Sequence, residues 1–308
     1  MPMERSPGLN TGVLVLKHVD QHADRSWIQL VGRVVRRQPL GVVGGMMVLL
    51  LILMATFAEQ LAPYDPKQAI FDMYHPPNWA SFMGTDHLGR DIFSRVVWGA
   101  RLSLYVGLVS VSVGISVGAL WGIFTGYFGG AADSLSQRIV DTLMAFPPLI
   151  LALSLMAVLQ QSVHNVIITL TILLIPTAAR TLRSTTLSLK EMGYVESALA
   201  TGSSHWRIIF RHILPNSLGT YIVLFTVNVA YAIVVEAALS FLGLGAPPDE
   251  PSWGGMLNAG AHAIQRAPWI ALFPGLAISL TVFGLNMLGD AVRDLTDVKL
   301  RGRDSQAE

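Results

Sequence analysis

Long apolar segments alternate with short polar segments along this chain. The first apolar segment, residues 40–58, has 19 uncharged residues, close to the roughly 20 that an α-helix needs to cross the hydrocarbon core of a bilayer. The segment 142–179 has 38 residues, too many for one crossing, and the polar stretch 160–165 divides it into two. This pattern predicts an all-α polytopic membrane protein with six transmembrane helices. The remaining apolar segments lie at 102–132, 217–244 and 268–288.

The polar segments set the expected division of the chain. The tail at 1–39 lacks the short apolar core of a cleavable signal peptide, so the first helix is expected to stay as an anchor. Residues 27–35 form either an interfacial helix or part of a solvated tail. The expected parts are a cytoplasmic tail at 1–39, a first transmembrane helix at 40–62, an extracytoplasmic segment at 63–101, a five-helix core at 102–293 with a cytoplasmic loop at 184–216, and a cytoplasmic tail at 294–308.

Glycines recur along the segment 102–132, mostly at four-residue spacing. Residues four apart share one helix face, and glycine lets a neighbouring helix approach that face closely, which matters where lipid supplies no hydrophobic drive. This helix is therefore expected to lie inside a bundle. Pro147-Pro148 and Pro176 fall inside the next two predicted helices as points of flexure. The recurring glycines are Gly107, Gly114, Gly118, Gly122 and Gly126.

The distribution of lysine and arginine predicts the orientation. Segments on one side of six spans carry 16 of these residues, and segments on the other side carry 5. Positive charge concentrates on the cytoplasmic side of membrane proteins. Both termini and the 184–216 loop are therefore expected in the cytoplasm.

Composition agrees with a membrane protein and excludes several other classes. Only 13% of the residues are charged and 52% are hydrophobic. The net charge of +1 gives no general basic field for nucleic acid. Cysteine is absent, which excludes disulfides, thiolate metal sites and cysteine nucleophiles.

The polar stretch 194–216, YVESALATGSSHWRIIFRHILPN, differs from a simple connector. Small residues follow Glu196, and the lone glycine Gly202 sits between two segments of helical character. The pattern predicts two short helices hinged at Gly202. Their small side chains leave a surface that another protein can approach closely; alternatively, the two helices form a hairpin that lies on its own bundle.

This stretch resembles the cytoplasmic loop of bacterial ABC-type uptake permeases. In that family Glu-Ala-Ala is followed by Gly four positions after the second Ala and by Leu-Pro twelve positions later. Here Ser197 replaces the first Ala, and His212 stands where Ile is common; serine is small enough to keep the packing surface. The resemblance implies that the loop docks into an ATPase, with Ala198 and Gly202 on a smooth face and Glu196 accepting hydrogen bonds. The implied docking residues are Glu196, Ser197, Ala198, Gly202, Leu214 and Pro215.

Two further stretches resemble the shorter permease of dipeptide, oligopeptide and nickel importers. They are GTDHLGRDIFSR at 84–95 and SFLGLGAPPDEPSWGGML at 240–257. The resemblance implies a type I ABC importer permease in the plasma (inner) membrane of a prokaryote. Import of dipeptides or oligopeptides is the leading expectation, with nickel or another small solute as the alternative.

The same resemblance implies the partners. They are a second homologous permease, two ATPases and an extracytoplasmic substrate-binding protein, all working in the lipid bilayer and without nucleic acid. ATP and Mg are expected on the partner ATPases, and no cofactor is expected on this chain. ATP would close the two ATPases, which would drag the attached loops and convert an inward-facing cavity to an outward-facing one.

The chain lacks the residues that its own catalysis would need. No GxxxxGK[ST] phosphate cradle, HExxH zinc motif or GxSxG nucleophile elbow occurs. We therefore expect a non-catalytic subunit. Asp86, His87 and Asp91 could suggest a metal site, but a glycine-rich turn and a helix N-cap explain the same residues. An ion-coupled secondary transporter is the alternative from another class, and it would call for inverted repeats and several midplane charges.

Glu236 is the ionisable residue of interest within a predicted span. A charge at that depth costs a few kcal/mol on insertion scales, so Glu236 should face the bundle interior or water. It either lines the translocation path, together with Asn228, or pairs with a polar group of the second permease or with interfacial water. Asn228 alone fits an interhelical hydrogen bond. Trp253, Trp269 and Tyr127 fit an aromatic belt at the membrane surfaces.

Overall fold

The computed structural model describes the backbone of residues 38–304 and the side chains of residues 38–296. The N-terminal tail predicted at 1–39 lies almost wholly outside the described residues, as does the helix considered at 27–35. Regular structure in the described part is helical, apart from an isolated β-bridge between Thr85 and Asp91. The prediction of an all-α fold is confirmed.

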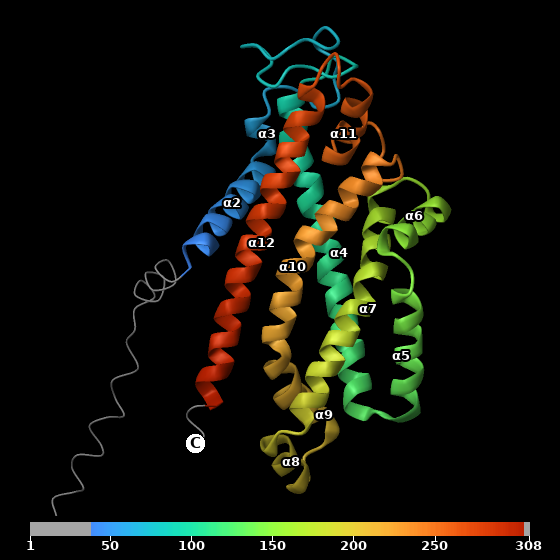
Figure 1. The fold of residues 1–308 in the computed structure, drawn as a ribbon, viewed down its shortest axis with the longest axis vertical. Helices are drawn as coiled ribbons and strands as arrows, with labels where there is room; N and C mark the ends of the chain where they lie inside the picture. The colour runs from blue at the N-terminus through green and yellow to red at the C-terminus, as the bar shows by residue number, and fades with distance from the viewer. Residues whose placement is uncertain (1–37, 305–308) are drawn as a thin grey trace, which may run out of the picture. The chain divides into compact units, whose positions relative to one another are not determined.

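The helices α4, α7, α10 and α12 run side by side along the long axis of the core (Figure 1). The segment between α3 and α4 lies with α11 at one end of this core, called the α11 end, and α8 and α9 lie at the other, called the α8 end. The elements are α2 (Pro39–Thr56), α3 (Ala58–Leu61), α4 (Ile92–Phe128), α5 (Gly130–Met144), α6 (Pro148–Leu159), α7 (Val163–Lys190), α8 (Gly193–Ala200), α9 (His205–Ile208), the π-helical η2 (Ile209–Ile213), α10 (Leu214–Phe241), α11 (Trp253–His262) and α12 (Trp269–Asp304).

Five helical stretches in the described part are long and apolar enough to cross a membrane. The pair α5 and α6 makes a sixth candidate when it is counted as one span, although its two helices are bent by 88°. The five are α2, α4, α7, the continuous run His205–Phe241 and α12 as far as Thr296.

The predicted third span is therefore not a straight helix. The short polar segment 133–141, which precedes the apolar segment 142–179 and was expected to be a connection, lies within helix α5. Pro147 ends the break before α6, with extended backbone (ψ 127°), and Pro148 opens that helix. Two successive prolines lack the N–H groups that would continue the hydrogen bonds of α5, so the chain turns there instead of flexing within one helix. Arg183 of α7 holds α5 through two bonds of 2.6 Å to the carboxylate of Asp133.

Helix α4 includes the last ten residues, 92–101, of the predicted extracytoplasmic segment. Asp91 is its N-cap and accepts a hydrogen bond of 2.8 Å from the backbone N–H of Ser94. Its other carboxylate oxygen accepts from Ser81 Oγ at 2.8 Å. The predicted N-cap is confirmed, and Arg95 and Arg101 lie inside the helix because the cap, rather than the last charge, sets where it begins.

The glycines of α4 bring α7 into close contact, as predicted. A β-carbon built on Gly118 would lie 2.5 Å from the carbonyl oxygen of Ile175 and 2.7 Å from the β-carbon of Ala178. A β-carbon on Gly114 would lie 2.9 Å from that of Leu174. The two backbones approach more closely than any side chain at these positions would allow.

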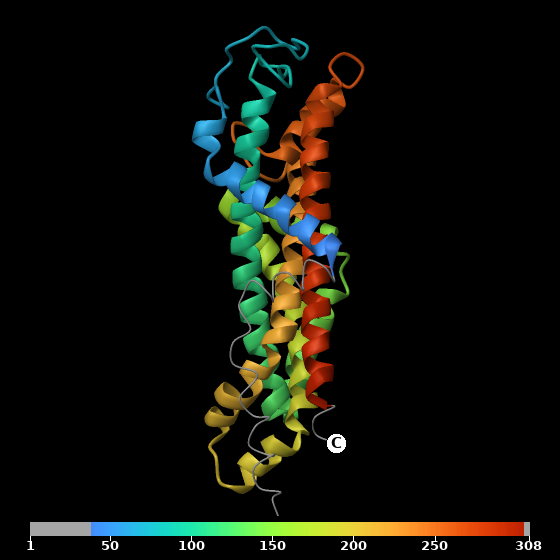
Figure 2. The same ribbon diagram turned by 90° about the vertical axis from the view of Figure 1, so that its left-hand side faces the viewer.

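Helix α2 lies obliquely across α12, as Figure 2 shows. A β-carbon on Gly44 would lie 2.7 Å from the carbonyl oxygen of Gly284, so the helices cross at two glycines. Only 17% of the 18 residues of α2 are buried. This helix therefore leaves most of its surface for lipid or for another chain.

The proposed aromatic belt is wrong for two of its three members. Trp253 is fully buried, and its indole N–H donates to the carbonyl oxygen of Val96 at 2.9 Å. Tyr127 is only 4% exposed. Their rings fill the space between helices, since an indole with a satisfied N–H is a large apolar group.

Replacing Gly118 by alanine should destabilise the protein by about 1–3 kcal/mol, because the added methyl group overpacks the contact with α7. The midpoint of thermal unfolding in detergent measures this loss. Gly45→Ala is the control, since a β-carbon there would meet only Leu288 Cδ1, at 3.9 Å. Equal midpoints for the two variants would contradict the close approach of α4 and α7.

Candidate functional site

The stretch 194–216 folds as helix α8, a turn at Gly202, and a second helix. Gly202 has a φ of +79°, a left-handed conformation that favours glycine. Its N–H donates to the carbonyl oxygen of Leu199 at 3.0 Å, and the N–H of Ser203 donates to that of Ala198 at 3.0 Å. These two bonds form a Schellman motif, which closes the end of α8. The predicted glycine hinge is thus a defined helix terminus.

The second helix of the stretch is not a separate short one. Ser204 caps α9, with its Oγ accepting from the N–H of Arg207 at 3.4 Å, and the helix then continues through η2 into α10. Pro215 accounts for the π-helical turn, since it lacks the N–H that would bond to the carbonyl of Arg211 and its ring crowds that carbonyl. The second half of the loop is therefore the first part of a spanning helix.

Four of the six predicted docking residues are exposed, and two are half-buried. Glu196, Ser197, Gly202 and Pro215 are exposed, whereas Ala198 is half-buried. Ala198 packs against the apolar cluster beneath α8, because its position on the helix faces inward together with the buried Val195. Leu214 is also half-buried. The half-buried Ala198 therefore gives part of its surface to this cluster.

Two aromatic residues that the sequence patterning missed stand on the exposed side of this stretch. Trp206 and Phe210 are 59% and 53% exposed, and their rings stack with centroids 6.1 Å apart. Their spacing of four residues on a helix was the available signal. Exposed aromatic residues of this kind are enriched in protein–protein interfaces.

Side chains at the ends of α4 and α7 fix the stretch to the core. Tyr127 Oη lies 2.8 Å from His205 Nδ1, and Lys190 Nζ donates to the carbonyl oxygen of Tyr127 at 2.9 Å. Trp206 contacts the ring of Phe124 edge-on. An apolar cluster below these contacts joins residues of α4, α7, α8, α9 and η2, namely Ala119, Ile123, Tyr127, Leu182, Val195, Ile208, Ile209 and Ile213. The stretch is therefore attached to these helices through packed and hydrogen-bonded side chains.

Glu236 does not line an open path within this chain. It is 1% exposed and accepts hydrogen bonds from Ser240 Oγ at 2.8 Å and from Ser103 Oγ at 3.3 Å. These hydroxyls come from α10 and α4, so the carboxyl group joins two packed helices. Asn228 is half-buried and bonds within α10, to the carbonyl oxygen of Leu224 at 2.7 Å, instead of between helices.

Comparison with protein families gives two matches. The family described as binding-protein-dependent transport system inner membrane component matches residues 118–302. The family described as the N-terminal TM domain of oligopeptide transport permease C matches residues 26–77.

Relatives are similar over most of their length. A glutathione transport system permease protein GsiD of Pectobacterium atrosepticum is 45% identical over 268 residues, which cover 86% of this chain and 89% of the relative. The GsiD protein of Escherichia coli O1:K1 is 45% identical over 270 residues, covering 87% and 89%.

A solved structure shares the fold. The structure described as inward facing conformations of the MetNI methionine ABC transporter aligns with a TM-score of 0.55 at 18% identity. The alignment covers 66% of this chain and 96% of that chain.

Tyr127→Phe should loosen the stretch without unfolding the core, because it removes the hydroxyl bonded to His205 and keeps the buried ring. A lost hydrogen bond of about 0.5–1.5 kcal/mol should speed amide hydrogen exchange across 193–208 by roughly two- to tenfold. Tyr105→Phe is the control, since Tyr105 is 49% exposed. Unchanged exchange in Tyr127→Phe would refute this attachment.

Proposed function

The chain belongs to the family of binding-protein-dependent transport system inner membrane components, as an ABC importer permease of the dipeptide and oligopeptide type, and on that basis we propose how it works. It forms one half of a translocation path for short peptides. Conformational changes of the ATPases are transmitted to its helices through the stretch 194–216. Membership of this family excludes the alternative hypothesis that the chain is an ion-coupled secondary transporter. The relatives named for glutathione support a short-peptide cargo over nickel.

The observation that carries the docking proposal is the construction of the 194–216 stretch. It presents Glu196 and the stacked rings of Trp206 and Phe210 outward, while its inner side is packed onto α4, α7 and α10. A partner that pulls on such a surface moves the spanning helices as rigid bodies. Exposed aromatic side chains supply the contact area that a docking surface needs.

The proposed assembly has four further parts around this chain. A second homologous permease completes the path, two ATPases bind ATP and Mg, and an extracytoplasmic binding protein delivers the peptide. The chain itself binds no cofactor and breaks no bond in this scheme. ATP-driven closure of the ATPases shifts the attached helices, and release of ADP and phosphate resets them.

The proposed orientation places the α8 end in the cytoplasm. The α4–α5 turn and the last described turn of α12 lie toward the same end as α8 (Figure 1). The charge count of 16 against 5 favours that side as cytoplasmic, with both termini there. The α11 end then faces outward, where a binding protein would arrive.

Gly202→Val should release the ATPases while the permease still inserts. A branched side chain at a left-handed position costs about 1–2 kcal/mol and opens the Schellman turn. We expect loss of ATPase co-purification and of ATP-driven peptide uptake in vesicles. Gly193→Val is the matched control, because both positions meet no atom within 4 Å and Gly193 lacks the positive φ. Retained ATPases and uptake in Gly202→Val would refute the docking role.

Trp206→Ala should weaken ATPase binding at least tenfold, as expected of an aromatic anchor at the centre of an interface. Titration of purified ATPase onto the permease pair in nanodiscs measures the change. Trp79→Ala is the control, since Trp79 is 94% exposed in the segment between α3 and α4. If both variants bind ATPase like the wild type, the aromatic pair is not part of the interface.

A further inference from the structure

A cavity of about 380 Å³ opens at the α11 end, opposite the stretch 194–216. The segment before α4, the connection from α10 to α11, and α11 itself form its walls. Its size lies within the range of 300–1,000 Å³ typical of small-molecule sites. Family membership and the docking proposal assign no role to this cavity.

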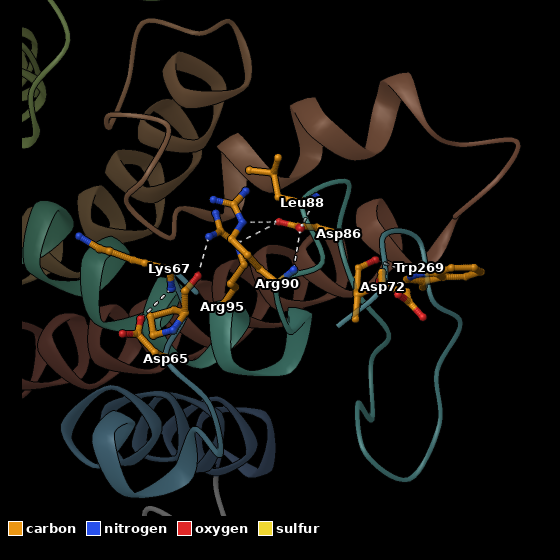
Figure 3. A network of polar contacts seen from close by, with 10 residues as sticks. Asp65, Lys67, Asp72, Asp86, Leu88, Arg90, Arg95 and Trp269 are labelled. Carbon is orange, nitrogen blue, oxygen red and sulfur yellow. Dashed lines mark hydrogen bonds and ion pairs between the residues drawn. The ribbon is translucent and has the colours of Figure 1, made fainter. Parts of the chain in front are cut away.

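Two buried arginines form the inner wall. Arg90 and Arg95 are 6% and 3% exposed and converge on the carboxylate of Asp86, which is 3% exposed (Figure 3). Arg90 Nε donates to Asp86 Oδ2 at 2.7 Å, whereas Arg95 Nε lies 3.8 Å from the same oxygen. Two guanidinium groups thus share one carboxylate, and one positive charge at this wall is not matched by it.

The guanidinium of Arg95 also has unused hydrogen-bonding capacity. One of its terminal nitrogens donates to the carbonyl oxygen of Pro66 at 2.8 Å. Its buried Nε has no hydrogen-bond partner within the described part of the chain. An unbonded donor is costly when buried, and a carboxylate that enters the cavity would accept from this Nε and lie against two guanidinium groups.

The mouth of the cavity carries the opposite charge. Asp249 is exposed and Glu250 is half-buried, and both line the cavity. Glu250 is paired with Lys67 at 2.7 Å, which leaves Asp249 as the more accessible carboxylate of the two. The cavity is therefore basic at depth and acidic at its rim.

We propose that this cavity binds a short peptide by its free termini, with the carboxylate on Arg90 and Arg95 and the ammonium group at Asp249. This inference rests on the proposed peptide transport and names where the chain first meets its cargo. Ser240 lines the cavity and donates to the buried Glu236, so the site adjoins the interior of the α4–α10 pair. Most of the lining residues come from the stretches 84–95 and 240–257.

The test measures peptide binding to the complete complex of permeases and ATPases in lipid nanodiscs, without the binding protein. Trialanine is the probe and is compared with N-acetyl-trialanine and trialanine amide. We expect each blocked peptide to bind about tenfold more weakly, since each loses one charge-assisted contact. Equal affinities of the three peptides, or no saturable binding of trialanine, would overturn the proposal.

Asp249→Asn assigns the ammonium contact to this cavity. It should weaken trialanine binding about tenfold and leave the binding of N-acetyl-trialanine unchanged, because that peptide has no ammonium group to lose. Asp72→Asn, a change of an exposed carboxylate that does not line the cavity, should leave both affinities unchanged. Asp249 lies at the exposed rim, so the variant should fold; its thermal midpoint checks this.

Two other results distinguish peptide binding in this cavity from a contact with the binding protein and from the proposed transport function. If Asp249→Asn weakens docking of the binding protein but leaves trialanine binding unchanged, the cavity is a protein contact and the proposal fails. ATP-driven trialanine uptake, measured in proteoliposomes with the binding protein restored, tests the proposed function separately. If ATP-driven uptake persists while trialanine and its two blocked forms bind with equal affinity, the cavity site is rejected and the proposed transport function is not.

Discussion

The close contact of α4 with α7 is the constraint on which the other features depend. Lipid gives two apolar helices no hydrophobic reason to associate, so the contact relies on backbones that approach at Gly114, Gly118 and Gly122. Helix α4 has 37 residues, about 55 Å at 1.5 Å per residue. Its first turn carries Arg95 beside the cavity at the α11 end, and its last turn carries Tyr127 beneath the 194–216 stretch. One helix therefore supports both sites, and its position is fixed by α7.

Much of the fold follows from local patterns in the sequence. The existence of the apolar helices, the glycine stripe of α4, the N-cap at Asp91 and the helix end at Gly202 each depend on residues close together in the chain. The stretch 194–216 is predictable for the same reason, because its helix–glycine–helix order is encoded within 23 residues. The family's signatures then supplied the expected partners, which composition and periodicity alone do not specify.

Other features depend on contacts between distant residues, so local patterns could not predict them. Tryptophan is common at membrane surfaces, yet Trp253 is buried, because Gly99 leaves room for its ring and the carbonyl oxygen of Val96 accepts a hydrogen bond from its N–H. Glu236 is an ionisable residue within an apolar helix, and one of the two hydroxyls that donate to its buried carboxyl group belongs to Ser103, 133 residues earlier in the chain. The orientation of Ala198 depends on the cluster that α8 covers. In each case the local sequence does not specify which helices pack against one another.

The unbroken path of the chain from His205 to Phe241 has a mechanical consequence. No flexible linker separates the aromatic pair at one end from Ser240 at the other, so there is little slack to absorb a displacement. A tilt of the tip at the α8 end is expected to reappear as a tilt of the opposite tip unless the helix bends at η2, beside Pro215. The wide turn at η2 is therefore the place where this long helix would bend most easily.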